Sequence, residues 1–204
     1  EETPDKSELP APLLNQGVEL AGSVAAMNSR TVDSHLEKKY ADKGVVFCSL
    51  GQAVTEHGDL VKNYLGRAVD PTYDRFAALN AACFSGGVFL YVPRGVTVDL
   101  PLHAFAGMSD GATDLGRTLV VLEEGAEATV LTELKSTAED SKGLHCGAIE
   151  LMVAPGANLR FVNLQDWGQG VWHFAHQRAL VGRDANLQWT LGALGSKLAK
   201  VNQH

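Results

Sequence analysis

The sequence predicts a mainly β protein, a right-handed, single-stranded parallel β-helix preceded by a small α-helical region. Two observations support this prediction. From Val88 onward, short β-rich segments come in pairs, and each pair is joined by a tight turn. The turns also recur at a nearly constant spacing: Gly95, Gly125 and Gly156 lie 30 and 31 residues apart, and Asp184 follows 28 residues later. A fixed period of this size is typical of repeat architectures.

Each repeat reads as strand, turn, strand. Aspartate tolerates left-handed backbone conformations better than most residues, so Asp184 can stand where the other turns have glycine. The stretches between units are long, at residues 101–117, 133–146 and 163–172. Long returns favour coils stacked in parallel over a hairpin meander, with a jelly roll as the nearest alternative. The four units are VFLYV-PRG-VTVDL, TLVVL-EEG-AEATVL, AIELMV-APG-ANLRFV and HQRALV-GRD-ANLQWT.

The chain divides into three parts before any function is considered. Residues 1–15 carry three prolines among charges and are predicted to be a flexible lead-in. Residues 16–87 are predicted to be mixed and mainly helical, with helices at 32–40, 53–65 and 74–84 and a strand at 45–48. The pair Gly86-Gly87 is expected to end the last helix. Residues 88–204 form the predicted β-helix core, truncated at its C-terminus.

Composition excludes several classes of function. The net charge is −7, and no Lys/Arg cluster is interleaved with aromatic residues, so we expect no nucleic-acid partner. No apolar run reaches the roughly 18 residues that a membrane span needs, and the first residues lack a signal-peptide pattern. The three cysteines form no Cys-x-x-Cys pair, which indicates free thiols in a reducing compartment. We therefore expect a cytoplasmic protein.

Several residue pairs that resemble reactive sites are separated by strand geometry. In a strand, side chains an odd number of residues apart point to opposite faces. His145 and Cys146 therefore diverge, and so do His173 and His176. The purely structural interpretation is that His176 packs with Trp172 and Phe174 on one face of the strand. Glu123 and Glu124 also diverge, and no row of carboxylates crosses the repeats as a polysaccharide-cleaving β-helix would require. We therefore assign no catalytic and no metal-binding residue.

Gln165 and Trp167 are the candidate binding residues for the interior of the coil. They follow a strand and should share one face of it. A buried Gln165 would need hydrogen-bond partners. The competing interpretation is that Trp167 is an aromatic residue beside a turn that closes one end of the coil.

Three strings, taken together and in order, resemble the SufB/SufD family of iron–sulfur cluster assembly scaffolds. The resemblance implies an N-terminal helical region, a β-helix core and a C-terminal helical region. It also implies that two paralogues pair through their β-helices, that each docks an ABC-type ATPase, SufC, and that sulfur arrives from a cysteine desulfurase system. The whole complex assembles the cluster, so this chain is expected to hold no cofactor firmly. The strings are Arg75–His103, Gly116–Val130 and Leu164–Leu198.

Within that family the chain looks more like the D-type than the B-type subunit. B-type subunits carry a cysteine that aligns near Leu134, whereas this chain reads LTELKSTAED there. They also tend to carry lysine at the position of Gln177. The expected function is a noncatalytic SufD-like scaffold that pairs with a SufB-type paralogue and SufC, in the cytoplasm or in a plastid stroma. The alternatives are a B-type subunit or a polysaccharide-active enzyme. We also expect the chain to be a piece of a longer protein, with the residues for pairing and ATPase docking beyond residue 204.

Overall fold

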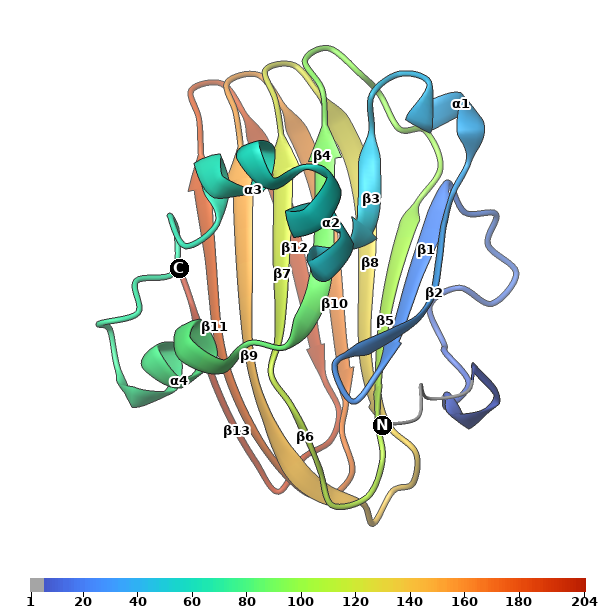
Figure 1. Ribbon diagram of the computed structural model, residues 1–204, viewed down its shortest axis with the longest axis vertical. Coiled ribbons are helices and arrows are strands. Elements are labelled where there is room, and N and C mark those ends of the chain that lie inside the picture. Colours follow the sequence, from blue (N-terminus) through green and yellow to red (C-terminus); the bar gives the residue numbers. More distant parts are fainter. Residues whose placement is uncertain (1–5) are drawn as a thin grey trace.

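The computed structural model describes residues 6–204, and its strands form two facing sheets that the chain visits in turn (Figure 1). Sheet A contains, in spatial order, β12 (Asn186–Ala193), β10 (Asn158–Asp166), β8 (Glu127–Ser136), β5 (Leu102–Met108), β1 (Gly22–Met27) and β2 (Arg30–Leu36). Sheet B contains β13 (Leu198–Gln203), β11 (Gly170–Val181), β9 (Lys142–Val153), β7 (Gly116–Leu122), β4 (Gly86–Val92) and β3 (Val46–Ser49), and β6 (Ala112–Asp114) pairs with β9.

Strands one coil apart pair in parallel, which confirms the β-helix. In sheet A, β10 pairs with β8 and β12, and β5 pairs with β8 and β1. In sheet B, β9 pairs with β7 and β11, and β11 pairs with β13. Each coil therefore contributes one strand to each sheet. The returns between the predicted units are also largely strand rather than loop, since β5, β9 and β11 begin within them.

The periodic turns have the backbone conformation that the sequence predicts. The φ angles of Gly95, Gly125 and Gly156 are 68°, 68° and 69°, and that of Asp184 is 56°. The turns also stack. The main-chain N–H of each turn glycine donates to a carbonyl oxygen in the turn of the following coil: Gly95 to Glu124 (2.9 Å), Gly125 to Pro155 (3.1 Å) and Gly156 to Arg183 (3.0 Å).

The helix predicted at residues 32–40 is wrong. Residues through Leu36 belong to β2, and only Lys38–Ala41 are helical, as α1. Strand β2 pairs antiparallel with β1 through a two-residue turn, in which Asn28 and Ser29 have φ of 50° and 65°. Two consecutive positive φ angles match a type I′ hairpin. Pairing with β1 therefore outweighs the local helical propensity of the sequence, and the first strands of the solenoid come from the region predicted to be mainly helical.

Helices cover the outer face of sheet B (Figure 1). The predicted helix at 53–65 is two helices, and the one at 74–84 is found as α4, with the Asp74 carboxylate accepting from the N–H groups of Phe76 and Ala77. Helix α4 ends at Cys83, and Gly86 and Gly87, which were predicted to end it, are the first residues of β4. The helices are α2 (Leu50–Glu56), α3 (Gly58–Tyr64) and α4 (Arg75–Cys83), besides a 3₁₀ turn at Lys6–Glu8.

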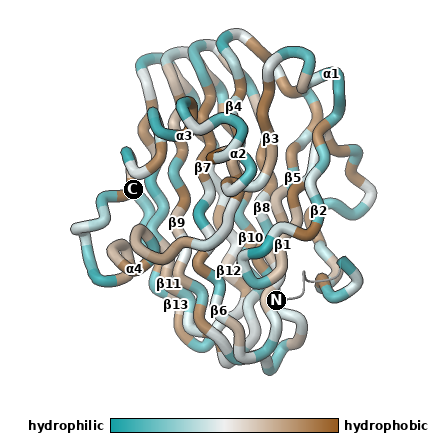
Figure 2. Tube along the Cα trace, viewed as in Figure 1, coloured by the Kyte–Doolittle hydropathy of each residue, from teal (hydrophilic) through white to brown (hydrophobic). Residues whose placement is uncertain are grey.

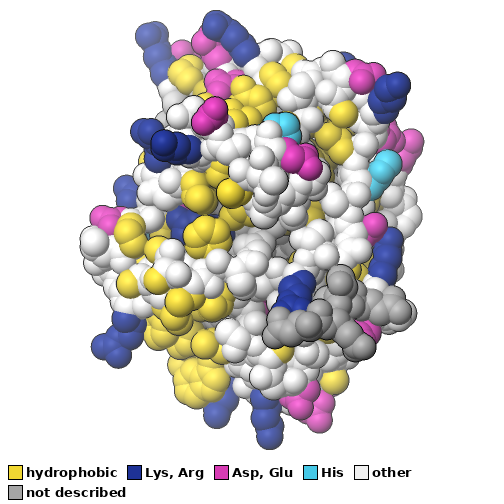
Figure 3. All heavy atoms as spheres, viewed as in Figure 1, with side chains coloured by type: hydrophobic (Ala, Val, Ile, Leu, Met, Phe, Trp, Pro, Cys, Tyr) yellow, Lys and Arg dark blue, Asp and Glu magenta, His cyan; other side chains and the backbone are white. Residues whose placement is uncertain are grey.

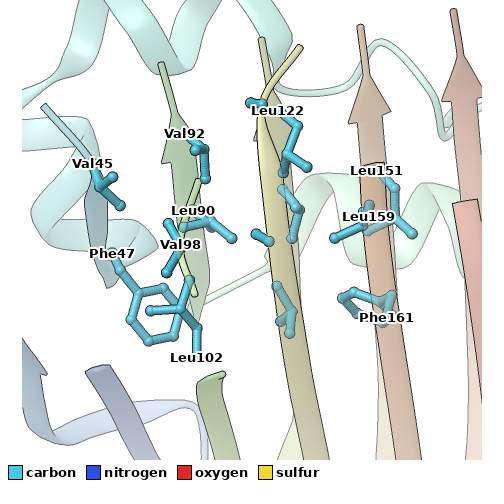
Figure 4. Packing of buried hydrophobic residues seen from close by; sticks show 14 of the residues in the cluster. Val45, Phe47, Leu90, Val92, Val98, Leu102, Leu122, Leu151, Leu159 and Phe161 are labelled. Atoms are coloured by element: carbon cyan, nitrogen blue, oxygen red, sulfur yellow. The ribbon is translucent and has the colours of Figure 1, made fainter. Parts of the chain in front are cut away.

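The core lies in the lumen between the two sheets. Apolar side chains from both sheets converge there near the stacked turns, among them Leu90, Leu151 and Phe161 (Figure 4). Along the strands apolar and polar residues alternate in many places, as expected where one face is inside (Figure 2). The lumen therefore supplies the main apolar core of the fold.

The exposed surface of the face that carries α4 is mixed, with apolar patches among charged groups (Figure 3). Tyr73 and Trp172 are among the large apolar side chains left exposed, at 58% and 42%. None of the helices within residues 6–204 combines the length and the apolar character needed to cross a membrane.

Candidate functional site in the lumen

The lumen changes from apolar to polar with distance from the stacked turns. Leu159 and Phe161 on β10 belong to the apolar core, but Asn163 and Gln165 follow on the same strand and face. On sheet B, inward positions carry His145, His173 and Gln177. All of these polar side chains are buried. Buried polar groups are costly unless they are hydrogen-bonded, so this layer is the candidate site.

A hydrogen-bonded dyad, His145 and Asp114, stands at the centre of the layer. The Nδ1–H of His145 donates to Asp114 Oδ2 at 2.8 Å, since an ionised carboxylate only accepts. The Ser29 hydroxyl donates a hydrogen bond to Asp114 Oδ1. Burial alone would raise the pKa of Asp114, but the interactions with His145 and Ser29 outweigh it and hold that pKa below its ordinary value. Asp114 therefore stays ionised and fixes which nitrogen of His145 carries the proton.

His173 lies against His145 and is a neutral hydrogen-bond acceptor. Its ring stacks on that of His145, with centroids 4.8 Å apart. The indole N–H of Trp167 donates to His173 Nδ1 at 3.2 Å. Burial, helped by the neighbouring His145, lowers the pKa of His173 to about 3. His173 therefore accepts at Nδ1 and carries its proton on Nε2, which disfavours direct metal ligation by this ring.

Small residues leave a cavity of about 60 Å³ beside these rings. Its wall includes Ala104, Ala106, Gly147 and Ala175. A Cβ atom at Gly147 would lie 2.4 Å from Nε2 of His145, so the glycine makes room for that imidazole. A space of this size accommodates several water molecules or a ligand of a few non-hydrogen atoms.

The two sequence candidates are both buried in the lumen, although neither belongs to the residues that line the cavity. Gln165 donates from Nε2 to the Gly195 carbonyl at 3.0 Å, while its Oε1 has no hydrogen-bond partner within residues 6–204. Gln177 Oε1, in the cavity wall, is likewise buried without a partner in that range. Trp167 is 2% exposed and packs with Met108 and Val171. The prediction that Gln165 and Trp167 share the interior face agrees with this geometry, whereas their binding role stays a prediction.

Cys146 and His176, the second members of the pairs His145/Cys146 and His173/His176, lie outside the lumen, under α4. His176 Nε2 is 2.9 Å from Asp74 Oδ1, and Phe174 stacks on Phe76 with centroids 3.7 Å apart. Cys146 Sγ donates to the Phe76 carbonyl at 3.4 Å. Both pairs are thus split across the strand as predicted. Phe174 and His176 pack on the outer face of β11 as predicted, whereas Trp172, on the same face, is partly exposed.

None of the three cysteines lies in the polar layer. Burial raises the pKa of Cys146 to about 11 and that of Cys48, which packs with α2, to about 11. Cys83 is exposed at the end of α4. A thiolate is the reactive form of cysteine, so the two buried thiols are unreactive at neutral pH.

The carboxylates near the turns serve separate contacts. Glu123 accepts from the Tyr64 hydroxyl at 2.6 Å, and Glu124 pairs with Arg94 at 2.7 Å on the surface. Within residues 6–204 no three His, Cys, Asp or Glu side chains converge on a common metal position. The layer is thus suited to hydrogen bonding rather than to acid–base chemistry by paired carboxylates.

The dyad gives a pH dependence with a defined sign. An unfolded aspartate titrates near pH 3.9, and the folded pKa of Asp114 lies lower, so its stabilisation is complete above about pH 5 and is lost as the pH falls toward and through the folded pKa. We expect Asp114→Asn to lose about 1–3 kcal/mol at pH 7. The gap to the wild type should narrow below about pH 4 in urea unfolding followed by circular dichroism. A gap that stays constant down to pH 2.5 would contradict this role.

Sequence reasoning missed Asp114, Ser29 and Asn163, and it named Gln177 only as a position that separates the two subunit types. A signal for part of the layer is present, because Asp114, His145 and His173 lie 31 and 28 residues apart, as do the turns at Gly125, Gly156 and Asp184. The registers of β6 with β9 and of β9 with β11 place these three at one level of sheet B. The repeat period of the turns therefore also locates the stacked polar residues.

Comparison with known proteins adds a family to this geometry. Residues 105–204 match the domain described as SUF system FeS cluster assembly, SufBD core domain, and residues 20–104 match the SufBD protein N-terminal region. Iron–sulfur cluster assembly SufBD family proteins of Staphylococcus saprophyticus and Staphylococcus haemolyticus are each 34% identical over 180 residues. One of Staphylococcus epidermidis is 33% identical over the same length. The matches cover 88% of this chain but only 39% of each relative.

Proposed function

The chain belongs to the SufBD family of the SUF iron–sulfur cluster assembly system, and from this premise we propose that it is part of a D-type scaffold subunit. In this proposal the whole protein pairs with a B-type paralogue and an ABC-type ATPase of the SufC kind. Sulfur comes from a cysteine desulfurase system, and the iron–sulfur cluster is the product of the complex. The subunit positions its partners and performs no catalysis itself. Its place of action is the cytoplasm or a plastid stroma.

The observation that carries the D-type assignment is the chemistry of the lumen wall. The resemblance places the B-type cysteine near Leu134, and Leu134 lines the cavity together with Gln177, the other position that separates the two types. Leucine has no group that can accept sulfur. The cysteines of the chain lie elsewhere, two of them buried outside the lumen and one exposed on α4. These facts support a subunit that shapes the complex without carrying sulfur in its coil.

The test uses the whole protein rather than this stretch of it. Affinity purification of the tagged full-length protein should recover a B-type paralogue and an ABC-type ATPase in constant ratio. The purified complex is then treated with a cysteine desulfurase and ³⁵S-cysteine, and the labelled chains are separated. We expect persulfide label on the B-type chain and none above background on this one. Failure to recover either partner would count against the complex, and stoichiometric label on this chain would identify it as a B-type variant.

A further inference from the structure

A buried carboxylate on the outside of the coil is not used by the lumen site. Glu133, on β8, is 1% exposed, and strand alternation turns its side chain away from the lumen, toward which those of its neighbours Thr132 and Leu134 point. Its two oxygens accept from the main-chain N–H of Leu13, at 2.8 and 2.9 Å, and one of them also accepts from the N–H of Leu14, at 3.0 Å. Carboxylates on outward strand positions are normally solvated, so this one is covered for a specific reason.

The cover is the segment Leu9–Leu14, which we call the strap. Lys135 Nζ on β8 donates to the Ala11 carbonyl at 3.3 Å. Leu9 and Pro10 approach Gly107 on β5 so closely that a Cβ there would lie 3.0–3.1 Å from their side chains. The hydrogen bonds to β8 all use the main chain of the strap, and the Leu13 side chain is 54% exposed. The strand face therefore contacts mainly the main chain of the strap. Pro10 and Pro12 favour an extended backbone before Leu13, whereas Leu13 and Leu14 begin a turn in which the Gln16 N–H donates to the Leu13 carbonyl.

Two more side chains of the same face are buried next to Glu133. His103 and Phe105, both on β5, are 2% and 4% exposed. His103 Nε2 lies 3.7 Å from Glu133 Oε2 and has no hydrogen-bond partner within residues 6–204. Burial would raise the pKa of Glu133, but His103 and the two strap N–H groups outweigh it and keep that pKa below its ordinary value. The carboxylate is thus ionised and aimed at main-chain donors.

We propose that Glu133, His103 and Phe105 form a peptide-binding site that the strap occupies in cis and that a partner polypeptide can occupy in its place. The partner segment has the chemistry of the strap: it is proline-containing and apolar, and it offers the carboxylate two consecutive main-chain N–H groups at the start of a turn. The strap is suited to exchange because residues 15–20, which join it to the coil, form no helix or strand. The first main-chain bond beyond them runs from Ala21 to Pro101.

The test removes the two donors without touching the site. In the full chain, the double variant L13P/L14P lacks both N–H groups that Glu133 accepts, because proline has none. The matched control, L13A/L14A, keeps them. The probe is a fluorescent synthetic peptide of residues 8–16, ELPAPLLNQ, followed by anisotropy. We expect the proline variant to bind the peptide at least about tenfold more tightly than the wild type or the alanine control, since only its site is vacant; tenfold corresponds to about 1.4 kcal/mol.

Two controls assign the binding to this site. Adding E133A to the proline variant should abolish peptide binding, and a peptide with proline at the positions of Leu13 and Leu14 should not bind. The single variants L13P and L14P, which disturb the chain less, should bind with intermediate affinity and serve where the double variant does not fold. Equal binding by the wild type and the proline variants, or binding that survives E133A, would overturn the proposal. Absence of binding by all proline variants would overturn it as well.

Discussion

Replacing Glu150 with alanine is expected to lower the free energy of unfolding by about 3–5 kcal/mol, because it strands a buried arginine. Glu150, on β9, and Arg117, on β7, are 0% and 3% exposed. Arg117 donates to one Glu150 oxygen from Nε at 3.0 Å and from Nη2 at 2.8 Å. The same carboxylate accepts from the N–H groups of Gly66, Ala68 and Val69. It therefore fastens the loop before α4 onto sheet B.

A matched pair on the surface provides the control for Glu150. Arg94 and Glu124 also join adjacent coils, at 2.7 Å, but both are largely exposed. Glu124→Ala should cost about 0–1 kcal/mol. The double variant R117M/E150L should recover only the part of the loss that comes from the unpaired arginine, because it removes the buried charge but leaves the N–H groups of Gly66, Ala68 and Val69 without their acceptor. Urea unfolding of the four proteins measures these differences, and a loss below about 1 kcal/mol for Glu150→Ala would show that the buried pair is not a structural anchor.

Phe161→Ala is expected to lower the free energy of unfolding by about 3–5 kcal/mol, because it removes apolar contacts and leaves a cavity. Phe161 is fully buried in the apolar half of the lumen, and its ring meets that of Trp189 edge-on at a centroid distance of 5.6 Å. Its parallel partners are Val130 on one side and Trp189 on the other. The substitution therefore removes contacts to both neighbouring coils.

The neighbouring residue on the same strand is the control for Phe161. Arg160 is exposed and donates from Nε to Gln188 Oε1 at 2.9 Å. Arg160→Ala should change stability by no more than about 0.5 kcal/mol. Thermal or urea unfolding of both variants checks the expectation. Equal losses at positions 160 and 161 would mean that β10 does not alternate between an outside and a lumen face.

The coil was predictable because its turns are local. A residue with positive φ is needed at each turn, and glycine or aspartate recurs there at the repeat spacing, so Gly125, Gly156 and Asp184 reveal the architecture directly. The β1–β2 hairpin was missed because its two-residue turn is Asn28-Ser29, a weaker signal than Asn-Gly, and because the residues after it resemble a polar helix. Only the pairing of Thr31 with Ala26 and of Ser34 with Val24 makes that segment a strand.

The polar layer was harder to predict, because stacking brings together residues that are distant in sequence. Strand alternation correctly separates His145 from Cys146 and places Gln165 inside. It does not show that Asp114 orients His145 or that Trp167 donates to His173, since those contacts depend on side-chain direction across coils. The contact of the strap with β8 could not be predicted either, because Leu13 and Glu133 are 120 residues apart and Leu13 contributes a main-chain N–H.

Reconstitution of cluster assembly is the measurement that tests the scaffold role most directly. The B-type paralogue, the ABC-type ATPase, a cysteine desulfurase, cysteine, iron and ATP are combined with or without the whole protein, and cluster formation is followed by absorbance and by bound iron and sulfide. We predict that full cluster formation requires one equivalent of the protein per complex. Undiminished cluster formation without it would contradict the proposal that this SufBD family member is a required scaffold subunit.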